Sequence, residues 1–143
     1  MKGFLLDTNI PSELTRPRPS LHVERWLDQV DDTQLFLSVI SLAEILKGIS
    51  RLPDTRHRAQ LQQWLDETLR PWFENRILPV SQPIAERLGR LAGEQSSKGF
   101  SLPTADGLIA ATALEHDLIL VTRNVKDFER LGVALLNPWE PHL

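Results

Sequence analysis

Two hydrophobic patterns alternate along the chain. Short runs of consecutive apolar residues are typical of buried strands, and longer segments with apolar residues every three or four positions are typical of helices that bury one face. The strand-like runs cover residues 3–6, 35–38, 77–80, 118–122 and 134–136. Helices are predicted over 11–14, 20–30, 41–52, 55–72, from 81 past 92, and over 104–116 and 124–130.

Strands that alternate with helices indicate a parallel sheet covered on both faces. We therefore predict an α/β fold, a three-layer α/β/α sandwich whose mainly parallel central sheet has about five strands. The length of 143 residues suits one domain spanning 1–143. Sheets of this kind carry their sites outside the carboxyl ends of the strands, so polar residues at that edge are of interest.

Acidic residues stand at several of these strand ends. Asp7 follows the first predicted strand, Glu44 lies in the first turn of the helix after the second, and Asp127 in the first turn of the helix after the fourth. Asp106 lies in the first turn of the helix that leads into the fourth strand. That helix ends where the strand begins, so its N-terminus should lie back at the carboxyl edge. The helix after the third strand should run away from the same edge. Either the loop at 98–103 therefore reverses the chain, or one of the two helices lies oblique to the sheet, and the sequence leaves both possibilities open.

Each acid by itself also has a structural explanation. Ser41-x-x-Glu44 matches a capping box, Asp106 and Asp127 complement helix dipoles, and Asp7 suits a turn. Four carboxylates at one edge, however, repel one another unless a cation offsets their charge. Oxygen ligands without His or Cys favour Mg²⁺, with Mn²⁺ as a substitute, and such an ion supports phosphodiester hydrolysis.

Further polar residues fall on the same edge and are candidates for orienting the acids or contacting a substrate. The alternative for them is ordinary turn and N-cap chemistry, which is the better explanation for Asn124. Gly107, beside Asp106, either lets a ligand or backbone come close or serves packing. The candidates are Thr8, Asn9, Thr122, Arg123 and Asn124.

Composition limits the function classes. The absence of cysteine excludes disulfides and thiolate metal sites. With a net charge of −3, any contact with nucleic acid must be local or made through a partner. The apolar run before Asp7 is too short for a signal peptide and no stretch is long enough to span a bilayer, so we expect a cytoplasmic protein without a membrane partner.

Four motifs in order resemble the PIN domain, and specifically the VapC/FitB-like toxins of bacterial type II toxin–antitoxin systems. The resemblance covers essentially the whole chain. The motifs are Leu5-Leu6-Asp7-Thr8-Asn9, Ser38-Val39-Ile40-Ser41-Leu42-Ala43-Glu44, Asp106-Gly107-Leu108-Ile109-Ala110-Ala111-Thr112-Ala113 and Val121-Thr122-Arg123-Asn124-Val125-Lys126-Asp127-Phe128.

The resemblance implies a Mg²⁺-dependent ribonuclease that cleaves RNA. By motif position Asp7 and Asp106 match the metal-ligand aspartates, Glu44 the central glutamate and Asp127 the late acid, while Asn124 stands where many relatives carry aspartate. It also implies a homodimer inhibited by a cognate antitoxin, which supplies contact with DNA. An apolar groove for the antitoxin is expected near the helices at 20–51, with Leu21, Trp26 and Leu46 as possible contributors.

Two other function classes compete with this hypothesis. One is a vestigial, non-catalytic protein that works only within an antitoxin–DNA complex, although the presence of all four acids disfavours it. The other is a metal-dependent phosphatase, which would need an Asp-x-Asp motif where this chain has Asp7-Thr8-Asn9. Neither a phosphate-binding Gly-rich loop nor a Gly-x-Ser-x-Gly elbow occurs.

Overall fold

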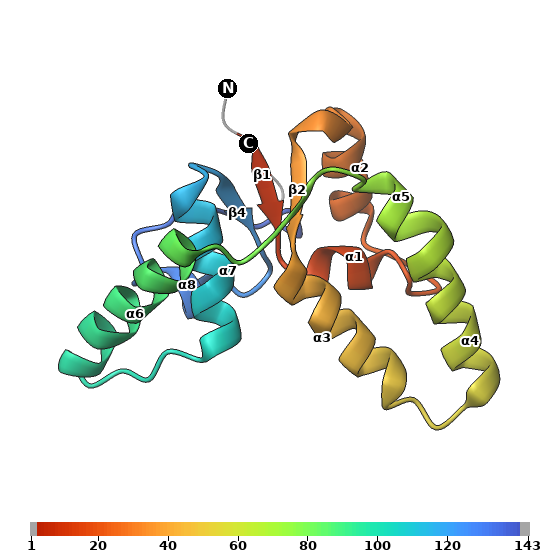
Figure 1. Cartoon of the computed structure of the whole chain (residues 1–143). Coiled ribbons are helices and arrows are strands. Elements are labelled where there is room, and N and C mark those ends of the chain that lie inside the picture. The colour runs from red at the N-terminus through yellow and green to blue at the C-terminus, as the bar shows by residue number, and fades with distance from the viewer. Residues whose placement is uncertain (1–2, 141–143) are drawn as a thin grey trace.

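A computed structural model describes residues 3–140 and shows a five-stranded parallel sheet at the centre of the molecule (Figure 1). The strand order is β3-β2-β1-β4-β5, and every neighbouring pair is parallel. The five predicted strands are all present; β2 has the predicted bounds, and the other four are shorter than their apolar runs. They are β1 (Phe4–Leu6), β2 (Leu35–Ser38), β3 (Ile77–Leu78), β4 (Ile119–Val121) and β5 (Leu135–Leu136).

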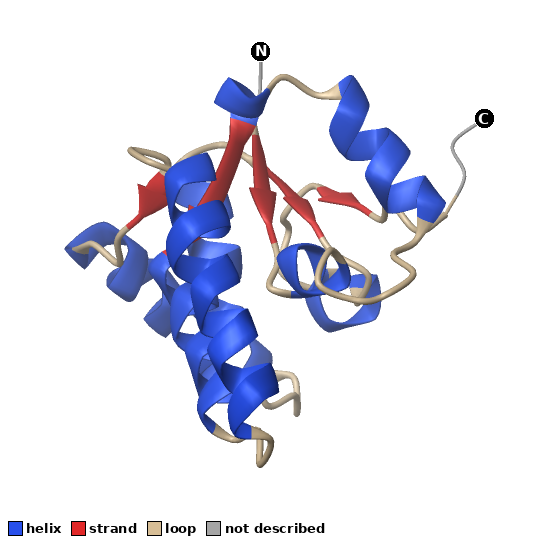
Figure 2. Cartoon of the chain, turned by 90° about the vertical axis from the view of Figure 1, so that its right-hand side faces the viewer, coloured by secondary structure: helices blue, strands red, loops and turns tan. Residues whose placement is uncertain are grey.

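Helices cover both faces of the sheet. The first half of the chain covers one face with α1 (Asn9–Glu13), α2 (Leu21–Gln29), the 3₁₀ turn η1 (Asp32–Gln34), α3 (Val39–Ser50), α4 (Thr55–Trp64), the π-helical η2 (Leu65–Leu69) and α5 (Arg70–Trp72). The second half covers the other with α7 (Thr104–Glu115) and α8 (Val125–Phe128), while α6 (Gln82–Ser97) packs against α7. Figure 2 shows the strands between these helices.

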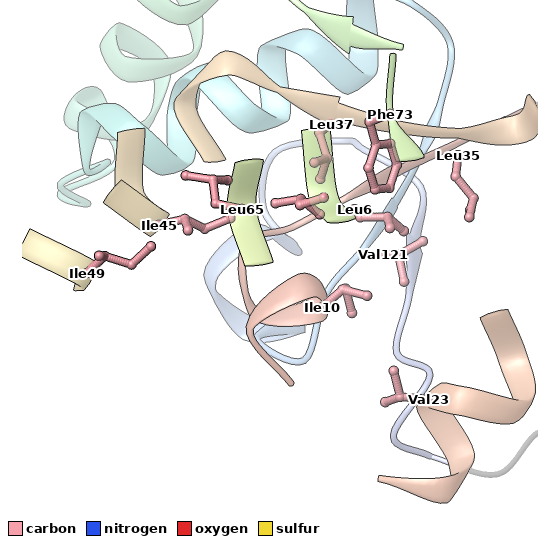
Figure 3. Packing of buried hydrophobic residues seen from close by; sticks show 11 residues of the cluster. Leu6, Ile10, Val23, Leu35, Leu37, Ile45, Ile49, Leu65, Phe73 and Val121 are labelled. Carbon is pink, nitrogen blue, oxygen red and sulfur yellow. The ribbon is translucent and has the colours of Figure 1, made fainter. Parts of the chain in front are cut away.

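Alternation along the strands divides the core between the two faces, because successive side chains of a strand point to opposite sides. Leu6 and Val121 pack with the helices of the first half, as Figure 3 shows. Leu5 and Leu120, one residue earlier in each strand, pack with α7 and α8. The predicted three-layer sandwich is therefore confirmed. No helix within residues 3–140 has the length and apolar character needed to cross a membrane.

Two predicted helices begin two residues earlier than expected, α1 at Asn9 rather than at 11 and α3 at Val39 rather than at 41. The helix expected from Ser41 begins at Val39, because the hydroxyl of Ser38 accepts a hydrogen bond from the Ile40 backbone N–H at 3.0 Å and caps it. The Ser41-x-x-Glu44 capping box does not form, and Glu44 lies in the second turn. α7 begins at Thr104, the first residue of its predicted range, and the preceding Pro103 makes no side-chain cap hydrogen bond.

Two pairs of helices extend beyond the carboxyl ends of the strands (Figure 1). α3 leads away from β2 and α4 returns, while α6 leads away from β3 and α7 returns to β4. The loop at 98–103 thus reverses the chain, which settles the question left open by the sequence. Gly99 permits the reversal with φ +85°, and the Phe100 N–H donates to the Gln95 carbonyl at 2.8 Å. The start of α7 is in this way held on the carboxyl side of the sheet.

Candidate metal centre

The structure brings the four predicted acids together at the carboxyl edge of the sheet. Asp7 follows β1 and is only 7 % exposed, whereas Asp127 on α8 is exposed. Glu44 on α3 and Asp106 on α7 are half-buried. Each of the other three carboxylates raises the pKa of Asp106, so the four charges act on one another. The carboxylates come from four different elements, and only the parallel order of the strands gathers them.

Burial and mutual repulsion make the two central aspartates reluctant to ionise. Loss of solvent is the largest cause of the raised pKa of Asp106, which reaches about 6, and the charges of Asp7, Asp127 and Glu44 add to it. Burial likewise raises the pKa of Asp7, although hydrogen bonds from Thr122 and Thr8 oppose the rise. Both residues would bind a proton more tightly than an isolated aspartate, and a cation at this place would reverse that tendency.

Two hydrogen bonds fix both oxygens of Asp7. The Thr8 backbone N–H donates to Oδ1 at 2.8 Å, and the Thr122 hydroxyl donates to Oδ2 at 2.8 Å. Thr122 is fully buried at the end of β4, and its oxygen accepts from the Asn124 backbone N–H at 3.0 Å and from Asn9 Nδ2 at 3.5 Å. The hydroxyl proton of Thr122 is thereby directed to Asp7, and the carboxylate is held in one orientation with lone pairs left over.

A second threonine holds Glu44. The Thr8 hydroxyl donates to Glu44 Oε1 at 2.6 Å and lies 3.0 Å from the hydroxyl oxygen of Ser41. Because a carboxylate only accepts, the single proton of Thr8 goes to Glu44, and Ser41 then donates to Thr8. Ser41 is fully buried and was not predicted as a site residue. It shares the buried stripe of α3 with Ile45 and Ile49, and a serine in an otherwise apolar stripe is the signal that would have identified it.

The donors at this edge suit a hard divalent cation. Within residues 3–140 none of the four acids forms an ion pair with a basic side chain, so nearby charges do not offset theirs. Asn9 Oδ1 is buried without a hydrogen-bond partner, next to Thr122. In the described part of the chain, no three His, Cys, Asp or Glu side chains are yet close enough to hold one ion. The donor chemistry fits Mg²⁺, and the carboxylates would have to close around it.

The remaining predicted residues adjoin residues of the centre in the sequence, since Arg123 and Asn124 follow Thr122 and Gly107 follows Asp106. Arg123 is exposed, with its guanidinium carbon 5.2 Å from the centre of the Trp139 ring. Asn124 occupies the N-cap position of α8, but its side chain makes no capping hydrogen bond. Gly107 serves packing, because a Cβ there would clash with Leu88 and lie 3.1 Å from Leu102. Of the two explanations given for Gly107, the packing explanation is therefore confirmed. The side chains that pack against it come from α6 and from the loop at 98–103.

Several hollows flank the helices that extend past the sheet. A cavity of about 340 Å³ borders Asp106 and Asp127 and is also lined by Lys126 and Arg130, which sequence reasoning did not single out. A larger, mainly apolar groove of about 740 Å³ lies between α3 and α4 and includes Leu46. Leu21 is exposed elsewhere on α2, and Trp26 packs edge-on against Phe4, so neither of these expected residues lines that groove.

Removing the Thr122 hydroxyl should weaken divalent-metal binding without unfolding the protein. In Thr122→Val the Oδ2 atom of Asp7 loses its donor, and residues that orient a metal ligand typically contribute about 10- to 100-fold to metal affinity. Isothermal titration with Mn²⁺ would measure the change. Thr33→Val, at an exposed threonine beside Asp31, is a control that should bind as the wild type does. Equal affinities for wild type and Thr122→Val would contradict the role given to Thr122.

Comparisons with known proteins point to one family. The family model of the PIN domain matches residues 4–134. Toxin FitB of Neisseria gonorrhoeae is 37 % identical over 136 residues, covering 95 % of this chain and 98 % of that protein. VapC ribonuclease Y4jK of Sinorhizobium fredii is 34 % identical over 138 residues, covering 96 % of this chain and 99 % of that protein. The crystal structure of FitAcB from Neisseria gonorrhoeae superposes with a TM-score of 0.91 at 36 % identity, covering 96 % of this chain and 99 % of the other.

Proposed function

Since the chain belongs to the PIN domain family, as one of its VapC/FitB-like toxins, we propose that it is an endoribonuclease that uses Mg²⁺ to hydrolyse phosphodiester bonds of RNA. One observation carries the proposal. Four carboxylates without ion-pair partners in residues 3–140 meet at the carboxyl edge of the sheet, and burial and repulsion raise the pKa of two of them. The relatives named as VapC ribonucleases support RNA as the substrate.

Asp7 and Asp106 would hold the cation, because by motif position they match the metal-ligand aspartates of the PIN domain family. When bound, Mg²⁺ supplies charge for the scissile phosphate and lowers the pKa of water. Glu44 and Asp127 complete the negative edge and can accept hydrogen bonds from water around the site. Thr8 and Thr122 set the orientation of Glu44 and Asp7, so that less side-chain movement is needed when the cation binds.

A cognate antitoxin that inhibits the enzyme and connects it to DNA is the partner we propose. Solved relatives that are more than a quarter identical support this proposal, among them FitAB bound to an IR36 DNA fragment and VapBC2 from Rickettsia felis bound to a fragment of its promoter. The net charge of −3 fits indirect rather than direct contact with DNA. The expected homodimer stays a prediction, which sedimentation velocity of the purified chain would check.

Cleavage of a structured RNA by the purified chain, in Mg²⁺, in Mn²⁺ and with excess EDTA, tests the proposed activity. We expect cleavage with either ion and none with EDTA. Undiminished cleavage in EDTA would contradict the metal-dependent mechanism. Absence of cleavage with every ion and several RNA classes, by a folded protein, would instead favour a vestigial PIN domain that acts only within a complex with its antitoxin.

A further inference from the structure

The hollow beside Asp106 and Asp127 combines features that the hydrolytic reaction does not require. It has a volume of about 340 Å³ and is bounded by the end of α6, the loop at 98–103 and the segment at and after α8. This volume is at the small end of the range of about 300–1000 Å³ found for small-molecule sites, and so is suited to a single planar group. Since two of the four acids line it, whatever binds here lies next to the reacting phosphate.

A flat, cationic surface forms one side of this hollow. The Arg130 guanidinium lies over the Phe100 ring, with 3.7 Å from its carbon to the ring centre. Phe100 is 40 % exposed although it is a large apolar residue, one of few in residues 3–140 with this exposure. Nucleobases stack on aromatic rings and on guanidinium planes, and RNA-binding proteins commonly use such surfaces for unpaired bases.

A buried polar group and a free cation provide the remaining contacts. Gln95 lines the hollow and is only 4 % exposed. Its Nε2 donates to the Arg130 carbonyl at 3.3 Å, and within residues 3–140 its Oε1 accepts no hydrogen bond. Lys126 is exposed and forms no ion pair within the same part of the chain. The amide oxygen can accept from a base N–H, and the ammonium group can contact a phosphate.

We propose that this hollow binds one unpaired nucleobase of the RNA next to the scissile phosphate. The base stacks on the Phe100–Arg130 pair and donates a hydrogen bond to Gln95 Oε1, while Lys126 contacts the adjoining phosphate. The hollow then selects the nucleotide beside the cleavage point. This inference rests on the proposed function for its choice of RNA as ligand. Lys126 and Arg130 would give this site a local positive charge, although the net charge of the protein is −3.

Fluorescence anisotropy of labelled eight-nucleotide RNAs of random sequence, recorded in EDTA so that binding is separate from cleavage, tests the proposal. Phe100→Leu keeps an apolar side chain but removes the stacking plane, and should weaken binding roughly tenfold. Phe100→Tyr keeps the plane and should bind as the wild type does. Leu21→Ala, at a residue 64 % exposed on α2, is the matched surface control and should also bind normally.

The outcomes separate this proposal from the ribonuclease assignment. If the wild type cleaves RNA but Phe100→Leu binds and cleaves normally, the nucleobase site is wrong while the enzyme assignment stands. If the wild type binds RNA through Phe100 yet never cleaves it, the nucleobase site stands and the enzyme assignment fails. If Phe100→Leu weakens binding of the antitoxin but not of RNA, the hollow belongs to the antitoxin and the proposal is overturned.

Discussion

Asp7→Asn should reduce RNA cleavage by roughly 10³-fold, because a bound cation contributes several kcal/mol to the transition state and each 1.36 kcal/mol is a factor of ten. Asparagine keeps the size of the side chain but removes the charge that attracts the ion. The fold should survive, since neutralising a buried carboxylate relieves desolvation and the repulsion from Glu44 and Asp127. Initial rates on one defined RNA, together with thermal melting, would measure both effects.

Asp28→Asn is the control for this substitution, because it makes the same chemical change at an exposed position of α2, on a helix outside the site. It should cleave RNA at the wild-type rate. Two results would contradict the role of Asp7: wild-type activity in Asp7→Asn, or a loss of activity that is accompanied by unfolding and therefore explained by it.

Divalent-metal binding should weaken as the pH falls through about 6, where Asp106 takes up a proton. A protonated carboxyl group is a poor ligand, so at subsaturating metal the apparent affinity should fall about tenfold for each pH unit below that value. In Asp106→Asn the affinity should be low at every pH and should lose this dependence. Mn²⁺ titrations between pH 5 and 8, on both proteins, would show it. An identical pH dependence in wild type and variant would contradict the assignment.

The same titration predicts an effect on stability in EDTA. The pKa of Asp106 is 3.8 when unfolded and about 6 when folded, so between these values the folded state binds more protons. Stability therefore falls as the pH rises through this window, and it stays lower above it. After discounting for the partial exposure of Asp106, the loss is about 1 kcal/mol. Asp106→Asn should not show this loss of stability. Urea denaturation of both proteins at pH 4.5 and pH 7 would test this.

The difference between variant and wild type matters here, because other groups change stability in the opposite direction. Hydrogen bonds from Thr33 lower the pKa of Asp31, so that residue adds stability as the pH rises. Such contributions cancel when the free energy of unfolding of the variant is subtracted from that of the wild type at each pH. A difference that stays constant with pH would show that Asp106 is not the group responsible.

Sequence patterns were sufficient for the sheet and for the position of the acids. An apolar run ending in Asp7 indicates a buried strand with the carboxylate at its end. Parallel order then placed Glu44 and Asp127 at the same edge. Asp106 was harder, since its placement depended on how the loop at 98–103 returned the chain. That return relies on the positive φ of Gly99, a local conformation that periodicity does not encode.

Side-chain contacts between distant segments could not be predicted from the sequence. The spacing of Ser41 and Glu44 predicts a capping box, whereas the actual partner of Ser41 is Thr8, 33 positions away. The stacking of Arg130 on Phe100 joins two segments that are unremarkable in isolation. The π turn at Leu65–Leu69 also left no signal, since the helical stripe of 55–72 continues through it. Local rules predict elements well, and side-chain pairings across elements need the fold.

Direct measurement of Mn²⁺ binding, by electron paramagnetic resonance of the free ion, tests the central claim that the four acids form one divalent-metal site. The purified wild type should bind Mn²⁺, Mg²⁺ should compete for the same site, and Asp7→Asn and Asp106→Asn should each lose that binding while Asp28→Asn retains it. A folded wild type that leaves all the Mn²⁺ free, or aspartate variants that bind it as tightly as the wild type does, would contradict the claim.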